Sequence, residues 1–395
     1  MNAHLSIAEK LTLAVRSVIP AEELQHIALH EPRFHGNEWA YVKECIDTNW
    51  VSSTGSYVNR FEQMLAEFTG IPHAVAVVNG TAALHICLKL SGVSTNDEVL
   101  MPTLSFVATA NAVSYVGAIP HFVDSDRRTL GIDAVKLMDY LKEISDVRGS
   151  MIFNKRTGRR IKAVIPMHTF GHPVDLDALK EVCDHYHLTM IEDAAESLGS
   201  YYKGVHTGHQ GLMSAFSFNG NKIITTGGGG AILTHNAKLA EYARHLTTTA
   251  KVPHKWEYYH DEIGYNYRMP NINAALGCAQ LEQLPRFIQA KRSLADQYKL
   301  VFKDIQGVEF FEEAPYARSN YWLNVVLLHP EYADQRDELL NLSNARGVMT
   351  RPSWNPLHTL PMYAQAPKMD LSVAEELNGR IINIPSSVYD NAISI

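Results

Sequence analysis

The chain has 395 residues, of which 46% are hydrophobic and 19% are charged, and its formal net charge is −7. The apolar fraction is ample for two or three packed units, and the acidic balance disfavours a nucleic-acid binder, which usually presents a basic face. An anionic small ligand stays possible, because a local cluster of hydrogen-bond donors is enough to bind one.

The first 31 residues predict a helical extension. Periodic apolar residues over 5–28 predict two short helices separated by Pro20, and Glu9, Lys10 and Arg16 interrupt the apolar core that a signal peptide needs. No run in the chain reaches the roughly 18 apolar residues of a membrane span. We therefore expect a cytoplasmic protein without a membrane partner.

The four cysteines lie far apart and form no C-x-x-C pair. Each stands in an apolar or helix-like setting, which favours buried free thiols over disulfides or metal ligands. These residues are Cys45, Cys87, Cys183 and Cys278.

Short apolar runs alternate with helical segments from about residue 74 to residue 234, after a predicted helix over 37–47. This alternation predicts an α/β fold with a mostly parallel sheet and helices on both faces. A basic run at 154–162 predicts a polar hairpin before the next strand. The predicted strands are 74–78, 98–102, 119–124, 161–168, 188–193 and 231–234.

The pattern changes after about residue 270. A long helical run over 272–305 contains Pro285, which we expect to interrupt it, and mixed strands and a further helix follow. We predict a large domain over 32–270 and a smaller α+β domain over 271–395.

Ligands of such sheets bind beyond the carboxyl ends of the strands. That rule selects 79–81, Ser105 with Phe106, His168, Asp193 and 217–222. Each position has an ordinary structural interpretation when it is taken alone. Asp193 is then a solvated carboxylate or a helix cap, and Lys222 is a solvated surface lysine.

Lys222 precedes the glycine run 227–230, whereas a P-loop places its glycines before the lysine. Taken together, the strand-end residues fit pyridoxal 5′-phosphate, which needs an amine, a carboxylate at its ring nitrogen, phosphate donors and an aromatic plate. The amine is Lys222, the carboxylate is Asp193 and the plate is Phe106. The predicted phosphate donors are Gly80, Thr81, Ala82 and Ser217.

The order of motifs resembles the DegT/DnrJ/EryC1/StrS family of sugar aminotransferases, from about residue 29 to residue 390. This resemblance implies the pyridoxal-phosphate fold-type I, which is aspartate-aminotransferase-like. The matching stretches are WVSSTGSYVNRFE (50–62), NGTAALH (79–85), PTLSFVATANAVSYVGAIPHFVD (102–124), HTFGHPVD (168–175), EDAAESLG (192–199), SFSFNGNKIITTGGGG, GYNYRMPNINAALGCAQL (264–281) and TRPSWNPLH (350–358).

The resemblance implies roles at the matching positions. Lys222 is implied to bind the cofactor covalently and to move the proton, with Asp193 at the ring nitrogen. Glu196 is implied to contact the cofactor near its phenolic oxygen, and Asn266 to reach the phosphate of the other subunit in a homodimer with shared sites. Three alternatives stay open: Phe106 as plain core, Asn266 as a turn residue and Glu196 as a water-bound carboxylate. Many relatives read TTGEGG where this chain has four glycines, which weakens any role tied to that glutamate.

The resemblance also bears on the substrate. Some members carry histidine in place of the lysine and act as sugar dehydratases, so Lys222 favours transamination from L-glutamate to a nucleotide-linked keto sugar. The N-terminal segments look most like the LegC-type subgroup, which implies C4 amination of a UDP-linked 4-keto-6-deoxy-N-acetylhexosamine. GDP- and dTDP-linked sugars, a dehydratase and a non-catalytic member of the fold are the alternatives. The candidate substrate residues are His168, Arg268, Arg351, Trp354 and His358.

Overall fold

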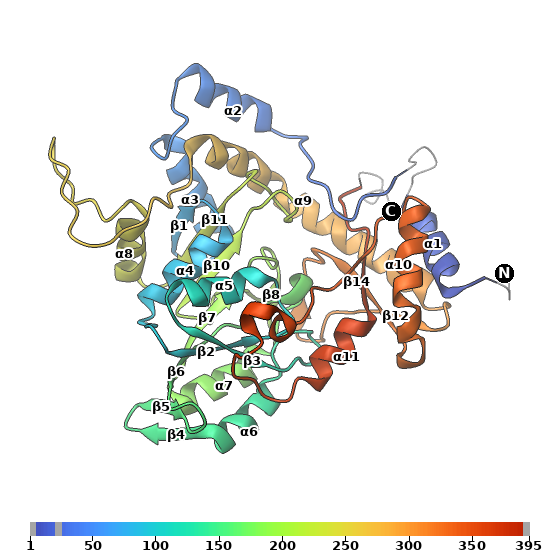
Figure 1. Cartoon of the computed structure of the whole chain (residues 1–395). Helices are drawn as coiled ribbons and strands as arrows, with labels where there is room; N and C mark the ends of the chain where they lie inside the picture. The colour runs from blue at the N-terminus through green and yellow to red at the C-terminus, as the bar shows by residue number, and fades with distance from the viewer. Residues whose placement is uncertain (1–4, 20–25, 390–395) are drawn as a thin grey trace.

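The computed structural model describes residues 5–19 and 26–389 (Figure 1). The helices are α1 Ile7–Val18, α2 Glu38–Asp47, α3 Ser56–Thr69, α4 Gly80–Leu90, α5 Val107–Tyr115, α6 Ala134–Ile144, α7 Leu176–Tyr186, α8 Ala237–Thr247, α9 Asn271–Phe302, α10 Arg336–Ala345 and α11 Ser372–Arg380. Short 3₁₀ turns are η1 Thr169–Gly171, η2 Pro330–Gln335, η3 Leu357–Thr359 and η4 Pro361–Tyr363.

The strands form three sheets. In chain order they are β1 His73–Val77, β2 Glu98–Pro102, β3 Ile119–Val123, β4 Ser145–Arg148, β5 Met151–Asn154, β6 Arg160–Val164, β7 Thr189–Asp193, β8 Tyr201–Tyr202, β9 Val205–His206, β10 Met213–Ser217, β11 Gly230–Thr234, β12 Val308–Phe310, β13 Ala317–Arg318, β14 Asn324–Leu328, β15 Arg351–Pro352 and β16 Ile381–Ile384.

The largest sheet has the order β1-β11-β10-β7-β6-β2-β3. Strands β10, β7, β6, β2 and β3 pair in parallel, whereas β11 is antiparallel to both of its neighbours. The α/β fold class is therefore confirmed, with a mixed central sheet. The polar hairpin predicted at 154–162 joins β5 to β6, which pair antiparallel, and Gly158 supplies a positive φ of 73° in its turn.

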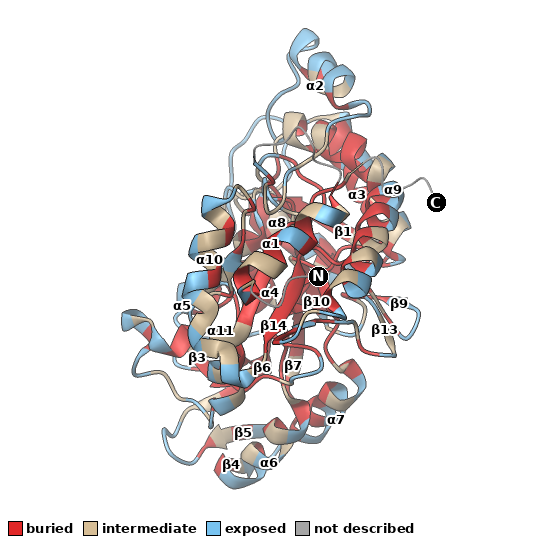
Figure 2. Cartoon of the chain, turned by 90° about the vertical axis from the view of Figure 1, so that its right-hand side faces the viewer, coloured by how far each residue is buried: buried red, intermediate tan, exposed pale blue. Residues whose placement is uncertain are grey.

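Helices cover both faces of this sheet, whose central strands are buried (Figure 2). Successive residues of β1 show why: Ala74 and Ala76 pack into one apolar cluster, and Val75 and Val77 pack into the other. The first cluster includes residues of α3 and α9, and the second includes residues of α4, α5 and α8. Because side chains of a strand alternate between faces, an almost unbroken apolar run indicates a strand buried on both sides.

A smaller sheet, β12-β14-β16-β15, belongs to a second layered unit, which we call the small unit. Helix α1 packs into the core of this unit, where Leu11 and Val15 join Tyr298 and Ile382. Helix α1 lies within the helical extension that the sequence predicts over 1–31, and the treatment of this extension as a unit of its own stays a proposal. The predicted break at Pro20 lies outside the described residues, and the second predicted helix does not include Ile27, which forms a β-bridge with Val348.

Helix α9 continues through Pro285, so the predicted interruption is wrong. A proline inside a helix removes one backbone hydrogen bond and crowds the preceding turn. Packing against α2 and α3 on one side of the proline and against α1 and β12 on the other holds both halves of the helix. The domain boundary at residue 270 stays a proposal, because α9 contacts both units.

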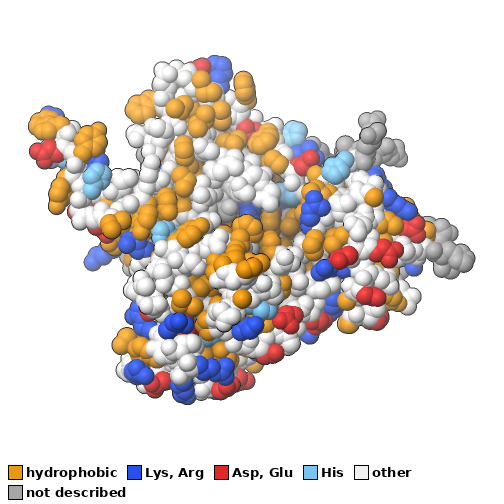
Figure 3. Space-filling model, in the orientation of Figure 1, with side chains coloured by type: hydrophobic (Ala, Val, Ile, Leu, Met, Phe, Trp, Pro, Cys, Tyr) orange, Lys and Arg blue, Asp and Glu red, His pale blue; other side chains and the backbone are white. Residues whose placement is uncertain are grey.

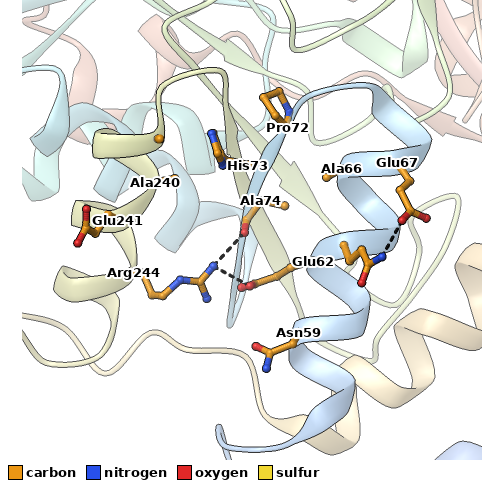
Figure 4. A pocket seen from close by; sticks show the side chains of 12 residues that line it. Asn59, Glu62, Ala66, Glu67, Pro72, His73, Ala74, Ala240, Glu241 and Arg244 are labelled. Carbon is orange, nitrogen blue, oxygen red and sulfur yellow. Dashed lines mark hydrogen bonds and ion pairs between the residues drawn. The ribbon is translucent and has the colours of Figure 1, made fainter. Parts of the chain in front are cut away.

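The outer edge of β1 is covered partly by backbone and partly by side chains. The backbone of 267–269 forms an antiparallel bridge with the end of β1, in which Arg268 faces Val77. Glu62 Oε1 accepts a hydrogen bond from the backbone N–H of Ala76 at 2.7 Å, and Arg244 pairs with the same carboxylate at 2.8 Å. Figure 4 shows both side chains in an open cavity of about 520 Å³ between α3 and α8. Side chains that satisfy an edge in this way hinder pairing with a further strand.

All four cysteines are free and buried, as the sequence predicts. Within the described ranges, no helix has both the length and the apolar character needed to cross a bilayer. The cytoplasmic location stays a prediction.

His172 should make folding stability depend on pH. Burial lowers the pKa of its imidazole from 6.5 to about 4, and the ring packs edge-on against Phe311 and Tyr321 with no hydrogen-bond partner. As pH falls from about 6.5 to about 4, the unfolded chain binds a proton that the folded chain does not, so the folded state loses up to about 3 kcal/mol. We expect His172→Phe to make this loss smaller in urea unfolding measured between pH 7.5 and pH 4.

The matched control is His35→Phe at an exposed histidine, which should keep the wild-type pH dependence. An equal pH dependence in His172→Phe and wild type would contradict the prediction.

Candidate active site

A cavity of about 350 Å³ lies at the carboxyl ends of β7 and β10. It brings together residues from seven distant parts of the chain. The strand order of the large sheet places five of these parts at one end of that sheet, and Trp322 and Trp354 come from the small unit. The lining residues are Asn79, Gly80, Thr81, Leu84, Phe106, Ala108, Thr109, Met167, Asp193, Ala195, Glu196, Ser217, Asn219, Asn221, Lys222, Trp322 and Trp354.

Lys222 enters the cavity from the loop after β10. Its Nζ lies 3.1 Å from Glu196 Oε1 and 3.9 Å from the centre of the Trp322 indole ring. The indole N–H of Trp322 donates to the carbonyl of Asn221 at 2.7 Å, which ties the loop beside the lysine to the small unit. A carboxylate and an aromatic face therefore hold this amine in place.

Glu196 is buried beside Lys222. Burial raises the pKa of its carboxyl to about 7, although the neighbouring Lys222 charge and the backbone N–H of Phe170 both lower it. The Phe170 N–H donates to Glu196 Oε2 at 2.8 Å. Each carboxylate oxygen thus has one donor, so the side chain is fixed rather than solvated.

Asp193 ends β7 and is also buried. Its Oδ2 accepts a hydrogen bond from the Thr109 hydroxyl at 2.7 Å, and its Oδ1 accepts one from the Ala195 N–H at 3.2 Å. Burial raises the pKa of this carboxyl, while those two hydrogen bonds and the Lys222 charge lower it. The aspartate is aimed into the cavity by a helix on one side and its own turn on the other.

The turn before α4 approaches the end of β10. Asn79 caps α4 by accepting a hydrogen bond from the Ala82 N–H at 2.8 Å. A β-carbon on Gly80 would lie 2.9 Å from the Cβ of Ser217, so only glycine permits this approach. The first N–H groups of α4 and the Ser217 hydroxyl therefore meet at one point, which suits an anion.

The glycine run 227–230 shapes the backbone beside this point. A β-carbon on Gly230 would lie 2.5 Å from the carbonyl carbon of Asn79, and Gly227 has a φ of 77°. A β-carbon on Gly229 would lie too close to Thr226 Oγ1 for any side chain there. Gly228 meets no such restriction, so a larger side chain, such as the glutamate of TTGEGG, fits the backbone there.

Three aromatic rings form one wall. Phe106 precedes α5 and lies edge-on to Trp354, with ring centres 6.4 Å apart, and Trp354 stacks on Phe170 at 4.9 Å. Both Phe106 and Trp354 line the cavity. The large sheet supplies one ring and the small unit the other, so the two units close the cavity together.

Two predicted substrate residues lie outside the lining in buried ion pairs. His168 Nε2 donates to Glu192 Oε2 at 3.0 Å, and its Nδ1 accepts the Val174 N–H. Arg268 Nη1 binds Glu62 Oε1 at 2.6 Å at the edge of β1. The Arg268 guanidinium and the His168 imidazole therefore already bind carboxylates of their own chain.

Two other predicted substrate residues contact the small unit. Arg351 binds the side chain of Asn344 at 3.0 Å, and His358 joins Thr103 at 2.8 Å to Glu375 at 3.0 Å. Neither lines the cavity, so of the five candidates the structure brings only Trp354 to it.

Two predicted cofactor residues also lie outside the lining. The Ala82 N–H is already bonded to Asn79, so it has no donor left for a phosphate. Asn266 is exposed and pairs with Thr248 by a β-bridge, away from the cavity of its own chain.

Several lining residues have no role that the sequence predicts. Asn79 stands inside the quoted NGTAALH motif, and Thr109 lies three residues after Phe106, so both had a local signal. Trp322 had none, because it lies 100 residues from Lys222 in another unit.

These groups fit pyridoxal phosphate. A primary amine, a buried carboxylate, a helix N-terminus with a hydroxyl beside it and an exposed phenyl ring face one cavity, which matches the functional groups of that cofactor. The close approach of Gly80 to Ser217 supports the fit, because it assembles the phosphate donors without any bound group.

Comparison with known proteins gives a consistent result. The sequence model of the DegT/DnrJ/EryC1/StrS aminotransferase family matches residues 32–390. A GDP-perosamine synthase from Escherichia coli O157:H7 is 40% identical over 364 residues, covering 92% of this chain and 94% of that protein. Another, from Caulobacter vibrioides, is 38% identical over 365 residues with the same coverage. The solved aminotransferase TlmJ from Streptoalloteichus hindustanus has a TM-score of 0.82 at 29% identity, covering 91% of this chain and 93% of its own.

Substitution of Asn79 should separate helix capping from anion binding. Asn79→Ala removes the cap of α4 and should lower stability by about 1 kcal/mol. Asn79→Asp keeps an accepting oxygen, so we expect near-wild-type stability but weaker binding of pyridoxal phosphate, because the new charge repels the phosphate. Urea unfolding and cofactor titration by fluorescence measure the two effects. Cofactor affinity in Asn79→Asp equal to that of wild type would show that the phosphate binds elsewhere.

Proposed function

The chain belongs to the DegT/DnrJ/EryC1/StrS aminotransferase family, and from this premise we propose that it transfers an amino group from L-glutamate to C4 of a GDP-linked 4-keto-6-deoxy sugar. It is a pyridoxal-phosphate-dependent nucleotide-sugar aminotransferase. The observation that carries the proposal is the placement of Lys222 in one cavity with Asp193, Glu196 and the turn before α4.

The nucleotide is proposed from the relatives. Two GDP-perosamine synthases match over 92% of this chain at 38–40% identity, which favours GDP over the UDP-linked N-acetylhexosamine predicted from the sequence. The LegC-like subgroup is not confirmed by these matches. The dTDP-linked sugar stays an alternative.

The residues divide the chemistry as follows in our proposal. When bound, pyridoxal phosphate supplies the aldehyde that carries the amino group between donor and acceptor and the ring that withdraws electrons from the reacting carbon. Asp193 holds a proton at the ring nitrogen, since its carboxylate is fixed by Thr109 and Ala195. The α4 turn and Ser217 hold the phosphate, and Phe106 covers the ring.

Lys222 forms the covalent anchor and moves the proton at its Nζ. Glu196, 3.1 Å away, and the Trp322 ring orient that nitrogen toward the cavity. Since a buried carboxyl with a pKa of about 7 changes charge near neutrality, Glu196 can balance the charge of the lysine as it gains and loses a proton. Trp354 and Phe170 limit water on the side where the sugar enters.

The charges of the cavity support our proposal of a homodimer with shared sites. Its lining contains two acids, Asp193 and Glu196, and one base, Lys222, which is already paired. Among the residues that the structure describes, the lining of a single chain therefore offers no further cation to a glutamate carboxylate or a sugar diphosphate. We propose that a second copy supplies polar and basic groups, among them Asn266.

Exposed apolar side chains support this assembly. The segment 251–263 extends away from the body of the chain after α8, and Figures 1 and 3 show it as a projection with hydrophobic side chains on its surface. Trp256, Tyr258 and Ile263 on this projection are 70–81% exposed, and Trp39 on α2 is 78% exposed. Large apolar side chains that are exposed in this way are typical of protein interfaces.

The function is tested with a panel of GDP-, UDP- and dTDP-linked 4-keto-6-deoxy sugars and L-glutamate. We expect amine formation, read by product mass, to be fastest with the GDP sugar. Lys222→Ala should lose about 100- to 10,000-fold or more in rate, because both covalent anchor and proton carrier are removed. Lys203→Ala, at an exposed lysine paired with Asp177, is the matched control and should keep activity.

Absence of amine gain with every sugar would refute the aminotransferase function. Faster turnover of a UDP or dTDP sugar would refute only the nucleotide assignment.

Mixed chains test the shared site. A Lys222→Ala chain and an Asn266→Ala chain should each be impaired, and random mixing after reversible dissociation should restore about one quarter of wild-type activity. Half of the dimers are then mixed, and each mixed dimer has one of its two sites intact. No recovery on mixing, with both chains dimeric by light scattering, would show that Asn266 acts within its own chain.

A further inference from the structure

Two hydroxyl groups form a hydrogen-bonded chain that ends at the carboxylate of Asp193. Thr109 Oγ1 lies 2.7 Å from Asp193 Oδ2, and Ser105 Oγ lies 3.1 Å from Thr109 Oγ1. Ser105 and Thr109 are fully buried, and Asp193 is 3% exposed. Both hydroxyl residues belong to the segment that leads from β2 into the first turn of α5.

The direction of these hydrogen bonds follows from the chemistry of the groups. An ionised carboxylate only accepts, so the single hydroxyl hydrogen of Thr109 points to Asp193. The oxygen of Thr109 then accepts the hydrogen of Ser105, which also lies within reach of Met167 Sδ at 3.0 Å. In this arrangement Ser105 donates to Thr109, and Thr109 donates to the Asp193 carboxylate. Hydrogen bonds donated to a carboxylate stabilise its charged form over its neutral form.

We propose that Thr109, backed by Ser105, is a positioning residue that keeps Asp193 ionised and aimed at the ring nitrogen of the cofactor. This inference rests on the proposed role of Asp193. Thr109 acts through the carboxylate and is not itself assigned a contact with the substrate.

The surroundings of Asp193 explain why this donor matters. Burial raises the pKa of the carboxyl, and the Thr109 hydroxyl, the Ala195 N–H and the charges of Lys222 and His168 oppose that rise. Lys222 pairs with Glu196, and the His168 ring is hydrogen-bonded to Glu192, so each of these groups is shared with another acid. Glu196 and the buried thiol Cys87 also interact electrostatically with Asp193. The Thr109 hydroxyl on α5 is a neutral group, and it donates its single hydrogen to Asp193.

The test compares Thr109→Val, which has the same shape without the hydroxyl, with Thr109→Ser, which retains it. In Thr109→Val we expect the acidic limb of kcat/KM against pH to move up by about one to two pH units, because a hydrogen bond to the charged form is lost. Thr109→Ser should return the profile toward that of wild type. Ser105→Ala, which leaves the Thr109–Asp193 bond in place, should shift it in the same direction by less.

A second measurement does not depend on turnover. In the cofactor-free chain, the infrared carbonyl band of protonated Asp193 is isolated by subtracting the spectrum of Asp193→Asn. We expect this band to appear at a higher pH in Thr109→Val than in wild type. Ser114→Ala, which removes another hydroxyl from α5 that bonds to the Ala110 carbonyl, is the control for structural change and should leave the titration unaltered.

The outcomes separate the two levels of inference. If Thr109→Val and wild type titrate alike in both measurements while Asp193→Asn is inactive, the inference for Thr109 is overturned and the role of Asp193 stands. If Asp193→Asn keeps wild-type activity, the proposed role of Asp193 fails and this inference fails with it. Should Thr109→Val not fold, an unshifted titration in Ser105→Ala would overturn the hydroxyl chain.

Discussion

Three buried carboxylates within five residues constrain the centre of this molecule. Glu192, Asp193 and Glu196 are each at most 3% exposed, and an unpaired charge at such a depth would be strongly destabilising. Each acid therefore has its own donors. Glu192 binds His168 and the backbone N–H groups of 208, 210 and 211, Asp193 binds Thr109 and Ala195, and Glu196 binds Lys222 and Phe170.

The donors of these acids arrive from separate loops, so satisfying them assembles the site. Burial alone would raise the pKa of Glu192, yet His168 and the backbone donors lower it below its usual value, which makes this acid a fixed structural anion. Asp193 and Glu196 keep raised pKa values and face the cavity instead. The same short segment thus provides one anion for the fold and two for the proposed chemistry.

The small unit completes what the large sheet begins. Trp322 precedes β14 and Trp354 follows β15, and both reach the cavity that the ends of β7 and β10 open. Since Trp322 binds the Asn221 carbonyl and contacts Lys222, movement between the units would change the placement of the lysine directly. In the proposed dimer, the segment 251–263 contributes exposed apolar side chains to the interface, and Asn266 of the second copy contributes a polar group to the cavity.

The sequence by itself determined the α/β class and most strands of the large sheet, because apolar runs and turn residues report burial and chain reversal locally. It did not predict β10, and it extended the strand that ends at Val164 to residue 168. Of the fourteen residues predicted for the site, eight line the cavity. The eight are Gly80, Thr81, Phe106, Asp193, Glu196, Ser217, Lys222 and Trp354. Only the tertiary structure decided which partner each polar side chain takes. His168 and Arg268 have the right chemistry for an anionic substrate, but in the folded chain their side chains bind Glu192 and Glu62. Packing between distant elements also carries α9 through Pro285 and brings the Trp322 indole to Lys222. The sequence does not predict these two contacts, because no local pattern encodes packing between distant elements.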